Sequence, residues 1–345
     1  MQQAAARWCE RHLGGPVAEQ FFDGGGSMSR VHGVVLADGR RVALKLRDAQ
    51  ERLRACAAAH RAAWAAGIGS PRPYAGPFPL DDAAPGGSWV SAEEWVDGGL
   101  AYPEGLTGGD VAARYGVLLA RIVRACPAPQ EVGTLEPPVP WLQYDHGDPA
   151  RVWPPPASSR WDPHRIEADL PPALLETARR ARSRLLADDA RTLPAVLGHA
   201  DLSGINARWF RSDSGPAGDR GWRVVVHDWD SIVSAPEAVI AGVGAADHAS
   251  TDVQRLASLA DGEALLDAYA TERGRPWTPL ELEVAWAAGT WVAAYNCAFA
   301  YLHGRRAGDG TAPVADGLLA DAAERLRRAG PGHAGPDRAT PGCQG

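Results

Sequence analysis

Two stretches in the second half of the chain decide the fold: His199-Ala-Asp201-Leu-Ser-Gly-Ile-Asn206 and Val224-Val-Val-His-Asp228-Trp-Asp230. Asp201 and Asn206 stand five residues apart, so one short loop carries a carboxylate and an amide. Asp228 follows Asn206 by 22 residues. In phosphoryl-transfer sites, one carboxylate orients a hydroxyl group, while an amide oxygen and a second carboxylate hold Mg²⁺ on the nucleotide phosphates. The two stretches have this layout.

The segment between the two motifs predicts a β-hairpin. Residues 207–210 read Ala-Arg-Trp-Phe, residues 222–226 read Trp-Arg-Val-Val-Val, and Gly and Pro residues lie between them. Aromatic and β-branched runs around a Gly/Pro centre are typical of paired strands. Because a hairpin returns the chain to its starting point, we expect Asp228 to lie beside Asn206. Oxygen ligands of this kind suit Mg²⁺, which binds few protein groups and keeps water and phosphate oxygens as its other ligands.

Lysine usage points to a further site residue. The chain has 35 Lys plus Arg, of which only Lys45 is a lysine. Lys45 lies in the strand-like run Arg41-Val-Ala-Leu-Lys45-Leu-Arg47. Kinases present the lysine that pairs the α and β phosphates of the nucleotide on such a strand. A compact ammonium on a flexible stem is not equivalent to a planar guanidinium in a tight phosphate site. Arginine could therefore not replace lysine at this position without loss of phosphate binding.

A glycine-rich turn precedes that strand. Residues 23–30 read Asp-Gly-Gly-Gly-Ser-Met-Ser-Arg. Glycines followed by hydroxyl residues allow backbone N–H groups to approach phosphate oxygens. We therefore assign Ser27, Met28 and Ser29 to nucleotide binding.

With these residues assembled, the chain resembles the aminoglycoside phosphotransferase family. The family signature, H-G-D-x-x-x-x-N followed by a hydrophobic strand and I-D-W or I-D-F, is matched by residues 199–206 and by Val226-His-Asp228-Trp229. The resemblance covers residues 15–305 and is most specific at 196–240. It implies an α+β, protein-kinase-like two-lobed fold with a small β-rich N-terminal lobe and a large, mostly helical C-terminal lobe.

The resemblance also implies roles for individual residues. Asp201 is expected to be the catalytic base or the group that orients the hydroxyl, and Asn206 and Asp228 the Mg²⁺ ligands. Lys45 is expected on the phosphates of ATP or GTP. The segment Ser91-Ala-Glu-Glu94-Trp-Val96-Asp-Gly98 would form the hinge, with the backbone of Glu94 and Val96 meeting the purine base.

Two departures from the family pattern affect these expectations. Ala200 replaces the usual glycine of the signature. The helix after the lysine strand usually carries a Glu that pairs with the lysine, but here the only Glu comes early, so Glu51 is the candidate partner. The sequence Ala235-Pro-Glu237 follows Asp228 too closely to leave room for a protein-kinase activation loop, which disfavours a protein substrate.

The hydrophobic patterns give a coarse organisation. Residues 1–97 are expected to form the nucleotide-binding lobe with the hinge, residues 98–328 the catalytic and acceptor-binding lobe, and residues 329–345 a disordered tail. Three strands are expected up to Arg47, followed by a helix to Ala66 and a strand at 89–96. Further helices are expected at 109–125, 172–187, 262–271 and 280–304.

Composition excludes several classes of protein. The formal net charge of −7 and a pI near 5.8 argue against nucleic acid or an anionic membrane as the main partner. No apolar run reaches membrane-spanning length, and the first residues lack the apolar core of a signal peptide. Five scattered cysteines lack metal-ligand spacing. These features predict a cytoplasmic protein with reduced thiols.

The acceptor is the least specified part of the site. Asp230, Asp267 and Tyr295 are assigned to acceptor binding. The Pro- and Trp-rich stretch 131–163 is either a lid or an ordered strap on the large lobe. We expect transfer of the γ-phosphoryl group of ATP or GTP to a hydroxyl of a small polar molecule, with an antibiotic as the first candidate. Alternatives are a metabolite kinase acting on a sugar, amino alcohol or nucleoside, and a pseudokinase that binds without turnover.

Overall fold

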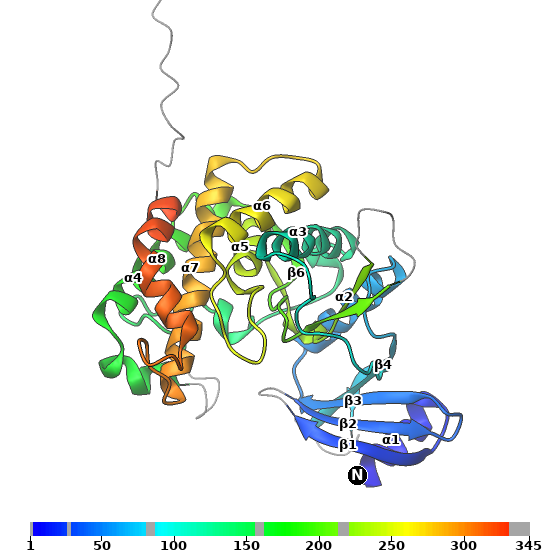
Figure 1. Ribbon diagram of the computed structural model, residues 1–345. Helices are drawn as coiled ribbons and strands as arrows, with labels where there is room; N and C mark the ends of the chain where they lie inside the picture. The colour runs from blue at the N-terminus through cyan, green and yellow to red at the C-terminus, as the bar shows by residue number, and fades with distance from the viewer. Residues whose placement is uncertain (1–2, 26–28, 81–86, 156–161, 213–220, 331–345) are drawn as a thin grey trace, which may run out of the picture. The chain divides into compact units, whose positions relative to one another are not determined.

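The computed structural model describes residues 3–25, 29–80, 87–155, 162–212 and 221–330 (Figure 1). The chain forms two compact units. The first comprises Met1–Gly105, Arg121–Pro138 and Val196–Ser234, and the second comprises Leu106–Ala120, Val139–Ala195 and Ala235–Gly345. The predicted disordered tail lies outside the described residues from residue 331 onward.

An antiparallel sheet forms the N-terminal part of the first unit, with the strand order β1-β2-β3-β5-β4. Its elements are α1 (Gln3–Leu13), β1 (Val17–Gly25), β2 (Arg30–Leu36), β3 (Arg41–Asp48), α2 (Arg52–Ala65), β4 (Pro73–Pro79) and β5 (Ser88–Glu94). The three strands before Arg47, the helix after them and the strand near residue 90 confirm the sequence prediction. Strand β4 was not predicted.

One face of this sheet is packed against α1. Trp8, Cys9 and Leu13 recur along one side of the helix and are buried against apolar residues of the sheet. On β3 those residues are Val42 and Leu44. Because successive side chains of a strand point to opposite faces, Ala43, Lys45 and Arg47 project from the other face. The hydrophobic pattern of β3 therefore places the single lysine away from the apolar core.

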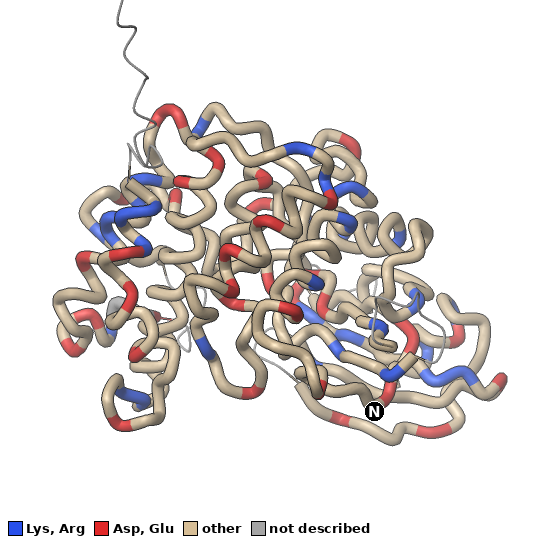
Figure 2. Tube along the Cα trace, turned by 45° about the horizontal axis from the view of Figure 1, so that its top comes forward, with Lys and Arg blue, Asp and Glu red and all other residues tan. Residues whose placement is uncertain are grey.

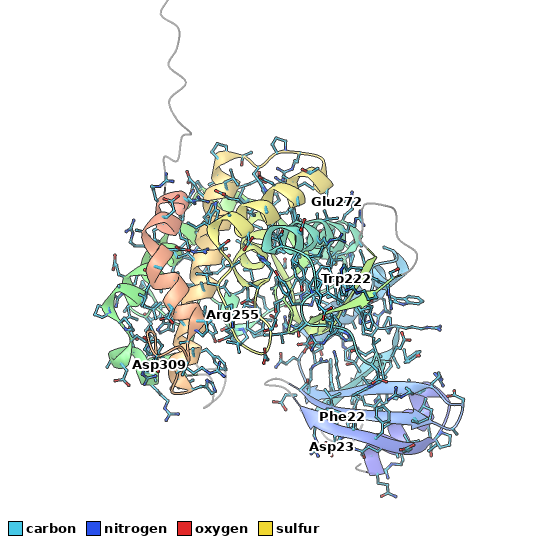
Figure 3. The ribbon with its side chains drawn as sticks, in the orientation of Figure 1. Phe22, Asp23, Trp222, Arg255, Glu272 and Asp309 are labelled. Carbon is cyan, nitrogen blue, oxygen red and sulfur yellow. The ribbon has the colours of Figure 1, made fainter. Side chains whose placement is uncertain are left out.

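The remaining strands of the first unit carry the two motifs. Strand β6 (Ala195–His199) pairs with β9 (Ile232–Pro236), and β7 (Ala207–Arg211) pairs with β8 (Trp222–Val226). The predicted hairpin is thus confirmed, although its turn at 213–220 lies outside the described residues. Trp222, labelled in Figure 3, lies on β8, and the guanidinium carbon of Arg211 stands 4.3 Å from its ring centre.

A glycine lets the loop after α2 approach this hairpin. The carbonyl of Gly69 accepts a hydrogen bond from the Val226 N–H at 2.8 Å. A Cβ atom at position 69 would lie 2.1 Å from the Val224 oxygen, which no side chain tolerates. This close contact helps to join the hairpin to the N-terminal segments in one compact unit.

Helices make up most of the second unit. They are α3 (Gly108–Ala125, which ends within the first unit), α4 (Pro172–Leu185), α5 (Glu237–Asp247), α6 (Leu259–Arg273), α7 (Pro279–Leu302) and α8 (Pro313–Ala329). α7 packs against α4, α5 and α8 (Figure 1). The four predicted helices correspond to α3, α4, α6 and α7, whereas α5 and α8 were not predicted. The predicted α+β fold class is confirmed.

Local sequence explains how α7 begins and how closely it packs. The Thr278 hydroxyl accepts from the Glu281 N–H at 3.2 Å, and the Glu281 carboxylate accepts from the Thr278 N–H at 2.8 Å, which is a capping box. Further along, α7 crosses α5 at Gly242. A Cβ atom there would lie 2.0 Å from the Ala285 oxygen, so the two backbones meet without a side chain between them.

The two compact units do not follow the predicted boundary at residue 97. The segment Val196–Ser234, which carries the 199–206 loop and Asp228, groups with the N-terminal sheet. The lobe boundary itself stays a prediction. Acidic and basic residues are interspersed along the trace of the chain (Figure 2). In the described part of the chain, no helix combines the length and the apolar character that crossing a membrane requires.

Candidate active site

The loop after β6 is closed by its own hydrogen bonds. The N–H groups of Asn206 and Ala207 both donate to the Ser203 carbonyl, at 3.0 and 2.8 Å. The Asn206 side-chain amide donates to the Asp201 carbonyl at 3.0 Å. This bond uses the nitrogen of the amide and leaves Oδ1 as the atom that can accept or ligate. The five-residue spacing therefore fixes the orientation of Asn206 relative to Asp201.

A buried histidine joins this loop to the segment that carries Asp228. Nδ1 of His199 accepts from the Asp201 N–H at 3.2 Å, and the other ring nitrogen lies 3.0 Å from the His227 carbonyl. Because Nδ1 accepts, the proton must sit on Nε2 and be donated to that carbonyl. Burial lowers the pKa of His199 to about 4, so the ring is neutral at pH 7. His199 therefore supports the loop and is not charged.

Asp228 lies at the end of the hairpin beside the same loop. The N–H of His227 donates to the Asn206 carbonyl at 2.7 Å, which continues the β7–β8 ladder by one residue. Asp228 has φ 58° and ψ 49°, a left-handed conformation that is uncommon for a residue other than glycine. Burial alone would raise the pKa of Asp228, but the charges of Lys45 and Arg47 help to hold it below its usual value. The carboxylate is therefore ionised at neutral pH.

Lys45 is paired with two carboxylates. Its Nζ lies 2.9 Å from Oε1 of Glu93 and 3.5 Å from Oδ1 of Asp228. The side chains of Lys45 and Glu93 are only 10% and 11% exposed. Burial alone would lower the pKa of Lys45, but the charges of Glu93 and Asp228 reverse this and raise it. Lys45 therefore keeps its positive charge beside Asp228.

The prediction that Glu51 pairs with Lys45 was wrong. Glu51 precedes the first turn of α2, its side chain is 67% exposed, and its carboxylate bonds Arg54 at 3.2 Å. The lysine's partner is Glu93, which stands on β5. No local pattern indicates this pair, because the pairing of Lys45 with Glu93 depends on how β3 and β5 are aligned.

A second ion pair lies next to the first. Arg47, two residues after Lys45 on β3, places Nε 2.7 Å from Oδ2 of Asp230. The Asp230 side chain is only 4% exposed, and burial raises its pKa. The assignment of Asp230 to acceptor binding is therefore corrected: its carboxylate is buried against β3 and occupied by Arg47.

Helix α2 also holds the segment after Asp228. The guanidinium of Arg52, which is buried, donates to the carbonyls of Asp230 and Ile232, each at 2.9 Å. About two turns further along the same face, the His60 ring is stacked on Trp229 with 4.9 Å between centroids and 3° between planes. Trp229 is thus a packing residue, and α2 fixes the backbone on the C-terminal side of Asp228.

The donor set fits a magnesium ion. Asp228 offers a carboxylate and Asn206 an amide oxygen, the hard oxygen ligands that Mg²⁺ prefers. Lys45 and Arg47 face three carboxylates, those of Glu93, Asp228 and Asp230, so a further cation is electrostatically favoured when all three are ionised. Among the described residues, no group of three or more His, Cys, Asp or Glu could hold a metal ion. An ion bound by two protein groups and phosphate oxygens needs no such group.

The other predicted nucleotide residues are only partly described. Ser27 and Met28 lie outside the described residues, and Ser29 directly precedes β2. Glu94 ends β5, and its N–H already donates to the Arg72 carbonyl at 2.8 Å. A contact with a purine base at the proposed hinge therefore depends on the Glu94 carbonyl and on the backbone of Val96.

The other predicted acceptor residues belong to the second compact unit. Tyr295 is buried in α7 and meets the Trp153 ring edge-on at 6.3 Å between centroids. Its place in the aromatic core speaks against a contact with the acceptor. Asp267 is exposed on α6.

The Trp-rich stretch is an ordered strap where it is described. Arg182 of α4 donates to the carbonyls of Tyr144, Asp148 and Arg151, at 2.6, 3.2 and 3.2 Å. The indole N–H of Trp291 donates to the Trp141 carbonyl at 2.9 Å. Residues 156–161, which include Trp161, lie outside the described part of the chain.

No protein-family model matches the chain, and no curated protein matches it. Solved structures match over nearly its whole length. An aminoglycoside phosphotransferase from Alicyclobacillus acidocaldarius is 16% identical, with 93% of each chain covered and a TM-score of 0.52. An amicoumacin kinase in complex with AMP-PNP and Ca²⁺ is 12% identical and covers 90% of this chain and 89% of its own, with a TM-score of 0.57.

The chain has the protein-kinase-like fold of these small-molecule phosphotransferases. A spectinomycin phosphotransferase in complex with ADP and spectinomycin shares it as well, at 11% identity and a TM-score of 0.51, with 95% of this chain and 94% of the other covered. At these identities the likeness shows the fold alone. A shared fold does not determine the chemistry, which depends on the residues of the site.

Proposed function

We propose that this protein transfers the γ-phosphoryl group of ATP or GTP to a hydroxyl of a small polar molecule. The observation that carries the proposal is the meeting of Lys45 with Asp228, at 3.5 Å, at the end of the hairpin that returns to Asn206. A buried cation, an ionised carboxylate and an oriented amide oxygen are the groups that neutralise and hold nucleotide phosphates in kinases.

Each residue has a defined task in this proposal. Asn206 Oδ1 and the Asp228 carboxylate would hold Mg²⁺, which neutralises charge on the nucleotide phosphates when bound. Lys45 would pair the α and β phosphates. Asp201, on the same loop as Asn206, would accept the proton of the attacking hydroxyl. The two neutral histidines of the site, His199 and His227, have pKa values lowered by burial to about 4, so neither is a strong base at pH 7.

The nucleotide's other contacts remain part of the proposal. The backbone of Glu94 and Val96 would bind the purine, and the glycine-rich segment with Ser27, Met28 and Ser29 would cover the phosphates. Because ATP, GTP and Mg²⁺ are cytoplasmic, the proposal includes a cytoplasmic location.

An antibiotic is the first candidate for the acceptor. The solved structures that share the fold include a spectinomycin phosphotransferase and an amicoumacin kinase. The exposed Asp267 keeps its proposed role in acceptor binding. A metabolite kinase is the alternative, with a sugar, amino alcohol or nucleoside as acceptor. The ionised Asp228 and the paired Lys45 favour an active kinase over a pseudokinase, since these are the two groups that would handle the nucleotide phosphates.

A screen of nucleotide consumption tests the proposal. The protein is incubated with MgATP or MgGTP and a panel of aminoglycosides, macrolides, other hydroxylated antibiotics, sugars, amino alcohols and nucleosides, and release of ADP or GDP is followed. We expect one acceptor class to stimulate release and to gain the mass of one phosphoryl group. If the acceptor is cationic, its KM should rise with added salt, because exposed charge pairs are screened within about 10 Å at 0.1 M ionic strength. The absence of both MgATP and MgGTP binding would contradict the proposal.

A further inference from the structure

The lysine of the candidate site takes its partner from a neighbouring strand. In the β3–β5 ladder, Ala43 is opposite Glu93 and Lys45 is opposite Ser91. All four side chains project from the same face of the sheet because their positions alternate by two along each strand. Lys45 reaches diagonally across the ladder to Glu93, and diagonal neighbours on a sheet are within reach of long side chains. The pair is almost completely buried.

Helix α2 offers no carboxylate for this lysine. Its sequence, Arg-Leu-Arg-Ala-Cys-Ala-Ala-Ala-His-Arg-Ala-Ala-Trp-Ala, contains neither Asp nor Glu. The positions that face the site are occupied by Cys56 and His60, which line a cavity of about 70 Å³ together with Lys45 and Glu93. The nearest acid, Glu51, is exposed and bonded to Arg54. Within the described residues, the helix contributes hydrogen bonds to the segment after Asp228 and no charge to Lys45.

We propose that Glu93 is the positioning residue for Lys45, in the place that a helix-borne glutamate would otherwise occupy. This inference rests on the proposed function. Glu93 holds the ammonium 3.5 Å from Asp228, so Lys45 is already oriented toward the metal-binding carboxylate. Since Glu93 directly precedes Glu94, strand β5 positions both the Lys45 side chain and the Glu94 backbone that is proposed to meet the purine base. Placement of Lys45 is then independent of any movement of α2.

The alternative is that Glu93 only compensates a buried charge and has no influence on phosphoryl transfer. The two views differ in where a substitution shows its effect. If Glu93 positions Lys45, Glu93→Gln should lower kcat and leave MgATP affinity nearly unchanged, because the base and the metal still anchor the nucleotide. A compensating charge would affect folding stability alone.

The test compares Glu93→Gln and Glu93→Asp with Glu51→Gln as the matched control. The Kd for MgATP is measured by tryptophan fluorescence, and turnover is measured as ADP release from MgATP, with water and then with the acceptor identified by the panel. We expect kcat of Glu93→Gln to fall by about tenfold to a hundredfold, as misplacement of a positioning group by an ångström does. Glu93→Asp, which retains the charge on a shorter stem, should keep more activity, and Glu51→Gln should match the wild type.

Epistasis then shows whether Glu93 acts through the lysine. Lys45→Met should abolish most turnover, and adding Glu93→Gln to it should cause no further loss. If the turnover of Glu93→Gln stays within about twofold of the wild type, which is the usual deviation from additivity between independent sites, the inference is overturned. If the double variant loses activity by the product of the two single-variant losses, the two residues act independently, and the inference is overturned as well. If Glu93→Gln does not fold, Glu93→Asp carries the same comparison. A wild-type protein that binds neither MgATP nor MgGTP and releases neither ADP nor GDP would instead overturn the proposed function, and this inference with it.

Discussion

The pair of Arg47 and Asp230 allows a sharp test of the site's electrostatics. Their side chains are 10% and 4% exposed and meet at 2.7 Å. Removing one partner of a buried ion pair costs about 3–5 kcal/mol, because the other charge is left buried without compensation. Arg47→Met and Asp230→Asn should therefore each lower the free energy of unfolding by about that amount. The double variant should cost no more than one single variant, since it leaves no unpaired charge.

The two single variants should respond differently to pH. Arg47 cannot lose its proton, so Asp230→Asn stays destabilised at all pH values near neutrality. Asp230 already has a raised pKa, and losing Arg47 would raise it further. A carboxyl whose pKa is higher in the folded than in the unfolded state destabilises the fold as pH rises through that interval. Arg47→Met should therefore regain stability between pH 8 and pH 5.

Urea unfolding followed by tryptophan fluorescence measures these changes. A double-mutant cycle at pH 7 should give a coupling energy of about 3 kcal/mol, within the range for residues in contact. Additive single effects would refute the pairing. Asp230→Asn should also weaken MgATP binding. Without Asp230, the Arg47 guanidinium would turn to Asp228, whose Oδ1 lies 3.9 Å away, and would compete with Mg²⁺ for that carboxylate.

Three further predictions concern separate parts of the chain. Lys45→Arg should turn over poorly, because a planar guanidinium cannot take the position of the ammonium. Reductive methylation of the native protein should modify this single lysine besides the N-terminus and be blocked by MgATP. Equal labelling with and without nucleotide would contradict its role. Asp247→Asn should stabilise the protein at pH 8, and this gain should shrink as the pH falls from 7 toward 4. Burial raises the pKa of Asp247 from 3.8 to about 7, so the charged form costs up to about 4 kcal/mol above that pH; a pH-independent difference in thermal stability would refute this. Arg182→Ala should destabilise the strap by about 2–4 kcal/mol and expose the 144–151 stretch to limited proteolysis, because three carbonyls lose their donor. If the stretch stays as resistant to proteolysis as in the wild type, Arg182 does not hold the strap.

The sequence was sufficient where local patterns decide the structure. The spacing of Asp201 and Asn206 and the apolar runs of the hairpin predicted which segments come together. The alternation of Val42, Leu44 and Lys45 explains why the lysine projects from the face opposite α1. Helices with an apolar face were located to within a few residues.

Other features depend on partners that are distant in sequence. The Lys45–Glu93 pair follows from the register between β3 and β5, which no local pattern encodes. Strand β4 was missed because Pro73, Pro77 and Pro79 argue against a strand, although it lies at the edge of the sheet, where proline is tolerated. Helix α5 was missed because residues Ala238–Ala246 are buried on all sides and show no amphipathic period.

Two residues that were expected to bind the acceptor are instead buried by partners that are distant in sequence. Asp230, two residues after the expected metal ligand, and Tyr295, on a long helix, were both assigned to acceptor binding. Asp230 instead pairs with Arg47, and Tyr295 packs on Trp153, because burial is set by neighbouring elements.

The most direct test of the proposed chemistry compares two carboxylates in one experiment. For the wild type, Asp201→Asn and Asp228→Ala, the Kd for MgATP and the kcat of phosphoryl transfer are measured with the same acceptor. Asp201→Asn should lower kcat by a factor on the order of 10² or more, because the general base is lost, with MgATP affinity nearly unchanged. Asp228→Ala should lose magnesium-dependent nucleotide binding. Near-normal turnover in Asp201→Asn, or unchanged MgATP binding in Asp228→Ala, would contradict the assignment of this loop and hairpin as a phosphoryl-transfer site.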